Sequence, residues 1–194
     1  MPSMILLAAV SGLPAEPLGE LDQFQLIGEM SVTAVHASRS AGQTFTVRRA
    51  GLLTAVELSL TINAPEGAEL TLDILDASAG YVPTAILGTV ALSGADLGPA
   101  PRDLAEDEVT GTLVPLQSFN IEVQPEDILG FRLSTDIELP DTGTAGWLRF
   151  SVAGADPYPD GEGFVNGTPG DVDFVFKMFV QPPPGIFEDG FEGL

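Results

Sequence analysis

The stretch TAVELSLTI, Thr54–Ile62, alternates between apolar and polar residues along its whole length. Its apolar side chains occupy every second position, which is the period of a β-strand with one buried face. These residues are Val56, Leu58, Leu60 and Ile62. The stretch therefore predicts a strand that covers a hydrophobic core.

The same period of two recurs along the chain. It is found in ELTLDILDA (69–77), SFNIEV (118–123), ILGFRLS (128–134), WLRFSV (147–152) and VDFVFKMFV (172–180). With further apolar runs at 24–27, 43–47 and 86–93, the chain contains about nine predicted strands separated by turn residues. We expect an all-β protein, an antiparallel two-sheet β-sandwich of jelly-roll type.

The length of 194 residues suits one domain with a sizeable core, and we assign residues 20–181 to it. Residues 1–15 contain the apolar run Met4–Val10, which is too short to span a membrane. This segment is similar to the end of a secretory signal, and the alternative is an apolar N-terminal arm. Residues 182–194 begin with three prolines and continue as an acidic tail.

The charge is strongly negative. Twenty-eight acidic residues face seven basic ones, which gives a net charge of −21. This charge repels nucleic acids and anionic lipids and attracts cations such as Ca²⁺. It also keeps an extracellular protein soluble. The absence of cysteine excludes disulfides and thiolate chemistry.

Enzyme activity is not expected. His36 is the only histidine, and the G-x-S-x-G pattern of a nucleophile elbow is absent. Zinc hydrolases need more than one histidine in nearly every case. Among 28 acidic residues, a pair at the separation used by glycosidases is expected by chance.

The loop DPYPDGEGFVNGTPGDVDF, 156–174, is the candidate metal site. Its acidic residues supply the oxygen ligands that Ca²⁺ prefers, and Asp22 joins them if the first and last strands are neighbours. The candidate ligands are Asp22, Asp156, Asp160, Glu162, Asp171 and Asp173. The alternative is a solvated connection, because Asp and Gly are ordinary turn residues. Asn166-Gly167 within it predicts a tight hairpin turn.

Three aromatic residues are candidates for sugar binding, because a flat ring stacks on the C–H face of a pyranose. They are Tyr81 and Tyr158 in loops and Trp147 at a strand start. The alternatives are loop packing for both tyrosines and a core or rim position for Trp147.

Four segments together resemble a family of bacterial extracellular β-sandwich modules found in secreted and surface proteins. They are AGQTFTVRRAGLLTAVELSL (41–60), LTLDILDASAGYVPTAILGTVALS (70–93), FNIEVQPEDILGFRLSTD (119–136) and the pair DPYPDGEGFVNG and DVDFVFKMFV (156–180). The ending IFEDGFEGL is similar to a C-terminal Ile-Phe-x-Asp-Gly-Phe-Glu motif of some secreted proteins of Gram-negative bacteria. The resemblance implies a jelly-roll-like sandwich and an extracellular location.

The resulting functional hypothesis is a secreted, non-catalytic β-sandwich with a binding or structural role at the cell surface or in the extracellular matrix, stabilised by Ca²⁺. One alternative is a carbohydrate-binding module that uses exposed aromatic residues. Another is a self-assembling surface or filament subunit that adds a strand to its neighbour's sheet. The expected partners are a polysaccharide, another copy or a surface protein, without nucleic acid or a membrane span.

Overall fold

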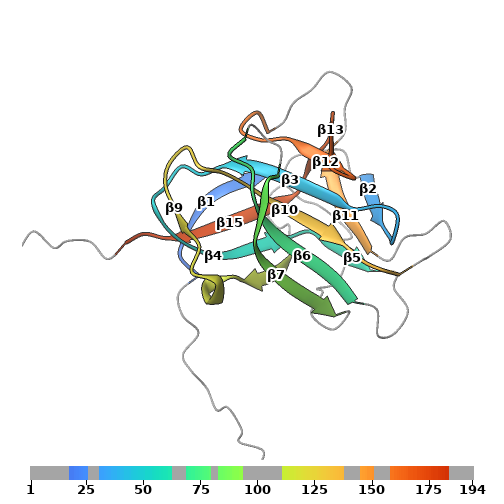
Figure 1. Cartoon of the computed structure of the whole chain (residues 1–194), viewed down its shortest axis with the longest axis horizontal. Coiled ribbons are helices and arrows are strands. Elements are labelled where there is room, and N and C mark those ends of the chain that lie inside the picture. The colour runs from blue at the N-terminus through green and yellow to red at the C-terminus, as the bar shows by residue number, and fades with distance from the viewer. Residues whose placement is uncertain are drawn as a thin grey trace, which may run out of the picture.

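Fifteen short β-strands and one 3₁₀ turn (η1, Gln117–Phe119) form the described part of the chain in this computed structural model (Figure 1). The structure describes residues 18–25, 31–62, 69–79, 83–93, 111–137, 145–150 and 158–183. The expectations for segment 1–15, Tyr81, Asp156 and the tail beyond Pro183 fall outside these ranges. Within them, no helix is long and apolar enough to cross a membrane.

The first sheet has the strand order β1-β15-β4-β8, and β9 also pairs with β4. All of its pairings are antiparallel. The strands are β1 (Glu20–Gln25), β15 (Phe176–Gln181), β4 (Gly51–Leu58), β8 (Thr112–Pro115) and β9 (Glu122–Val123). The first and last strands of the chain are therefore neighbours.

The second sheet has the order β13-β12-β3-β10-β6-β7 and is also antiparallel. Its strands are β13 (Thr168–Gly170), β12 (Gly163–Val165), β3 (Ala41–Thr46), β10 (Ile128–Ser134), β6 (Glu69–Asp76) and β7 (Ala85–Ser93). In Figure 1 this sheet lies in front of the first. The two-sheet antiparallel sandwich that the alternation predicts is confirmed.

The core lies between the two sheets. Phe45 on β3 stacks on Phe131 on β10 with ring centroids 4.7 Å apart. Phe176 on β15 approaches Phe45 from the opposite sheet at 5.8 Å. These rings are fully buried or nearly so. Burying one such side chain contributes about 1.5–3 kcal/mol, so the aromatic cluster joins the sheets.

A third, smaller ladder contains β2 (Ser31–Val35), β11 (Ala145–Phe150), β14 (Asp173–Phe174) and β5 (Leu60–Ile62). The strand predicted over 54–62 breaks at Ser59, after which β5 pairs with β11. The strand predicted over 172–180 breaks at Val175, and β14 pairs with β11 as well. Two predicted strands are therefore each divided where the chain passes from one sheet to another. This explains part of the difference between the nine expected strands and the fifteen described ones.

In strand β1, polar side chains face the core and apolar side chains face outwards, which reverses the usual pattern. Its glutamines Gln23 and Gln25 are buried, whereas Leu21 and Phe24 are exposed. The register shifts between Leu21 and Gln23, which marks a bulge at Asp22. The expected first strand at 24–27 is described only at Phe24 and Gln25, which end β1, and residues 26 and 27 lie outside the described ranges. Phe24 faces away from the core.

Candidate functional site

Asp22 sits at the bulge of β1 and holds the turn after β3. Its side chain is fully buried. Oδ2 accepts a hydrogen bond from the backbone N–H of Arg48 at 3.0 Å. Oδ1 lies 3.9 Å from Nε of Arg49 and has no hydrogen-bond partner in the described part of the chain. Asp22 therefore has positively charged neighbours from this turn.

Asp160 forms an ion pair with the guanidinium of Arg48. This hydrogen bond and the carboxylate charge raise the pKa of Arg48 above its ordinary value. The backbone carbonyl of Asp160 accepts a hydrogen bond from Oγ1 of Thr46 at 2.9 Å. Asp22 and Asp160 thus both contact Arg48, so the structure brings these two predicted ligands to the same residue.

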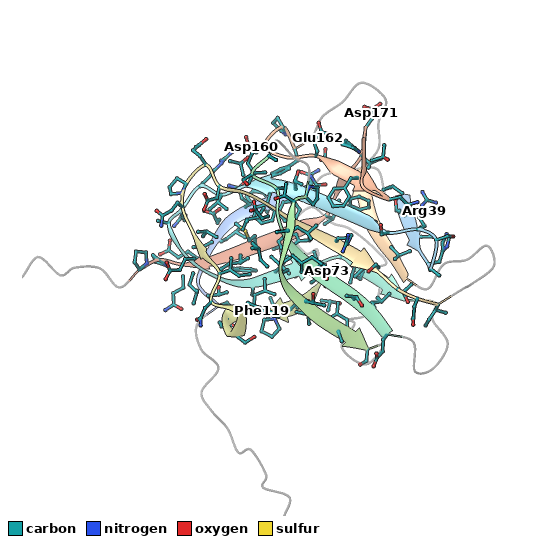
Figure 2. The ribbon with its side chains drawn as sticks, in the orientation of Figure 1. Arg39, Asp73, Phe119, Asp160, Glu162 and Asp171 are labelled. Atoms are coloured by element: carbon teal, nitrogen blue, oxygen red, sulfur yellow. The ribbon has the colours of Figure 1, made fainter. Side chains whose placement is uncertain are left out.

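The other described candidates, Glu162, Asp171 and Asp173, line a cavity of about 100 Å³ beside the β12–β13 hairpin. Figure 2 shows Asp160, Glu162 and Asp171 along the same upper rim of the sandwich. Glu162 is held through its backbone, because its carbonyl accepts from the N–H of Thr44 and its N–H donates to Oγ1 of Thr44, both at 2.9 Å.

Asp173 faces inward. It is buried, and Oδ1 accepts a hydrogen bond from Nε2 of Gln43 at 3.0 Å. Oε1 of Gln43 in turn accepts from the backbone N–H of Phe174 at 2.8 Å. Among the described residues, no group of three or more His, Cys, Asp or Glu side chains is arranged to hold a metal ion. Ca²⁺ binding stays a prediction.

The hairpin turn at Asn166-Gly167 is confirmed. Both residues have positive φ, 52° and 72°, as the tight two-residue turn requires. Oδ1 of Asn166 also accepts a hydrogen bond from the backbone N–H of Ser40 at 2.8 Å, which joins the turn to the start of β3.

Tyr158 is a core residue and not an exposed ring. It is 5% exposed, and its ring meets Phe176 edge-on at 5.3 Å. Its hydroxyl donates to Oε1 of Gln23 at 2.8 Å. In this arrangement its face is covered, which corrects the expectation of a surface platform. The backbone of Trp147 lies in β11, opposite Thr33 and Leu60. The structure does not describe its side chain, so its role in sugar binding stays a prediction.

The outer face of the first sheet is a feature that the sequence patterns did not single out. Its paired residues form a row across four strands, Phe24–Lys177–Glu57–Leu113. The next row is Leu21–Phe179–Ala55–Pro115. Directly paired side chains share one face of a sheet. In the sequence, this face is indicated only by DQFQ at 22–25, in which a phenylalanine lies between two glutamines.

No protein-family model matches this chain, and no curated protein matches it in sequence. The resemblance to bacterial extracellular modules, including that of the C-terminal tail, therefore stays a prediction.

Proposed function

We propose that this protein is a secreted, non-catalytic β-sandwich module with a binding or structural role at the cell surface or in the extracellular matrix, acting through the outer face of its first sheet. The observation that carries the proposal is the display of large apolar side chains on that face. Phe24 is 52% exposed, Leu113 43% and Leu21 41%. Phe24 and Leu21 lie on the edge strand β1, and Leu113 lies on β8 at the other end of the same face. Exposed apolar side chains on one face are typical of an interaction surface.

The two charges in the first row, on Lys177 and Glu57, balance each other. Nζ of Lys177 lies 3.1 Å from Oε2 of Glu57 in the middle of the first row. In a chain of net charge −21, repulsion between copies is weakest where the local charges cancel. The partner best suited to the face is a second copy. A twofold axis passing between Lys177 and Glu57 would bring Lys177 of each copy towards Glu57 of the other.

Two internal carboxylates have structural contacts. Asp73 accepts hydrogen bonds from Nη2 of Arg132 at 2.6 Å and from Oγ1 of Thr89 at 2.8 Å. Asp173 is held by Gln43 in the same way. Asp73 joins β6 to its neighbours β10 and β7, whereas Asp173 joins β14 to β3 of the second sheet.

Light scattering after size-exclusion chromatography tests the association. We expect the wild type to form a dimer as its concentration rises and Phe24→Ser to stay monomeric, because the substitution removes the largest exposed ring of the face. The matched control is Ile86→Ser, since Ile86 is 56% exposed but lies on β7 of the second sheet. A wild type that is monomeric at every concentration rules out the self-association.

Ca²⁺ at the 156–174 loop is part of the proposal. It rests on the acidic residues Glu162, Asp171 and Asp173, which border one cavity, although their carboxylates form no metal-binding group within the described residues. A ligand that binds only the folded state stabilises it by about 2.7 kcal/mol at a hundredfold excess over its Kd. We expect a higher melting temperature in CaCl₂ than in MgCl₂ or EDTA. Equal melting temperatures in Ca²⁺ and Mg²⁺ contradict a calcium site.

A further inference from the structure

A groove of about 460 Å³ lies at one end of the outer face of the first sheet, where β4 begins and β15 ends. Leu52 on β4 forms its floor. In the sheet register, Leu52 pairs with Gln181 on one side and with Glu122 on the other. These three side chains therefore form one row. The row spans two interstrand spacings, roughly 9–10 Å.

One wall of the groove is a polar segment that follows η1, whose Phe119 is labelled in Figure 2. Asn120, Glu122 and Gln124 line the groove at alternate positions. The residues between them, Ile121 and Val123, belong to the core. The core contacts of Ile121 and Val123 therefore fix the direction in which Glu122 and Gln124 project, whereas Asn120 has a left-handed backbone at the end of η1.

The opposite wall consists of Gln181, Pro182 and Pro183 at the end of β15. Within the described residues, the side chains of Asn120, Glu122, Gln124 and Gln181 make no hydrogen bond or ion pair. Three carboxamides and one carboxylate are thus available to a ligand, beside the apolar surfaces of Leu52 and the two prolines.

The backbone of the floor is already paired. Leu52 has strand neighbours on both sides, so an incoming peptide cannot extend the sheet at this place. Recognition in the groove therefore depends on side chains. This argues against capture of an extended peptide by strand addition.

The chemistry of the walls fits hydroxyl groups. A carboxamide both donates and accepts hydrogen bonds, as a hydroxyl does, and a carboxylate accepts from O–H groups. None of the lining residues is basic, and the chain has a net charge of −21, so the groove disfavours anions. Its volume lies in the range of small-molecule sites, about 300–1,000 Å³.

We infer that this groove binds a neutral saccharide, with Asn120, Glu122, Gln124 and Gln181 contacting hydroxyls and Leu52, Pro182 and Pro183 contacting C–H faces. The site is separate from the aromatic residues considered from the sequence. It does not depend on self-association, because its residues lie beyond the two apolar rows.

Titration calorimetry on the full chain tests the inference, with cellotriose, maltotriose, xylotriose and mannotriose as neutral probes and trigalacturonate as the anionic one. We expect one or more neutral trisaccharides to bind. Glu122→Ala and Gln124→Ala should each weaken that binding about tenfold, which corresponds to one lost hydrogen bond of about 1.4 kcal/mol. The control Glu69→Ala removes an exposed carboxylate at the start of β6 and should leave the affinity unchanged.

Three results overturn the inference. They are no binding of any neutral probe at millimolar concentration, binding that both groove variants retain, and tighter binding of trigalacturonate than of the neutral sugars. Thermal melts of each variant confirm that it is folded. The same titrations on Phe24→Ser separate the two proposals. This variant should bind the sugar as the wild type does, whether or not the wild type forms a dimer.

Discussion

Replacing Tyr158 with phenylalanine removes one oxygen atom from the interior and keeps the ring. The lost hydroxyl donates the 2.8 Å hydrogen bond to Oε1 of Gln23. Gln23 is 3% exposed, and its Nε2 has no hydrogen-bond partner in the described part of the chain. After the substitution, both polar atoms of this carboxamide are buried without a partner in that part.

The cost follows from this burial. Leaving a buried acceptor without its donor costs about 1–3 kcal/mol. For a domain of this size, each kcal/mol lowers the melting temperature by about 2–4 °C. We therefore expect Tyr158→Phe to melt roughly 2–12 °C below the wild type, measured by calorimetry and by urea unfolding with an unchanged m-value.

Gln23→Leu provides the matched control. When both partners of a buried hydrogen bond are replaced by apolar groups, the net cost can be close to zero. The double variant with Tyr158→Phe should therefore be more stable than the sum of the two single changes predicts, and a double-mutant cycle measures this coupling. A melting temperature within 1 °C of the wild type for Tyr158→Phe, together with additive single changes, refutes the buried contact.

Two further predictions concern the backbone and pH. Gly167→Ala should cost about 1–2 kcal/mol, because φ of +72° is strained for alanine, whereas the control Gly170→Ala, with open space around it, should change urea stability little. The pKa of Asp76 is lowered by hydrogen bonds from the backbone N–H and the hydroxyl of Ser78. A carboxyl with a lowered folded pKa stabilises the fold above its unfolded pKa, and this contribution is lost as the pH falls through the folded value. Asp76→Asn should thus weaken the acid dependence of urea stability, and an unchanged dependence contradicts the assignment.

The fold class could be read from the sequence because a period of two is a local property. The apolar residues that the alternation assigns to the core in β6, β10 and β15 are buried, as with Phe176, Met178 and Val180. The breaks at Ser59 and Val175 could not be read in this way. They depend on β11, which pairs with both continuing segments from a distant part of the chain.

The candidate site was predicted less well, because side-chain partners are set by tertiary contacts. Asp22 and Asp160 both meet Arg48, and Asp173 meets Gln43, across large distances in sequence. No local pattern identifies such pairs. The sequence shows that Asn120, Glu122 and Gln124 alternate with apolar residues and so lie on the outer side. Only the pairing of Glu122 with Leu52 shows that they border a groove.

Hydroxyl-radical footprinting across a concentration series tests the proposed interaction face most directly. At low concentration we expect Phe24 to be oxidised and the buried Phe176 to be protected. As the concentration rises, oxidation of Phe24, Leu21 and Leu113 should fall while that of Ile86 stays constant. If Phe24 stays equally reactive at every concentration, or if Ile86 becomes protected instead, the outer face of the first sheet is not where copies of this protein meet.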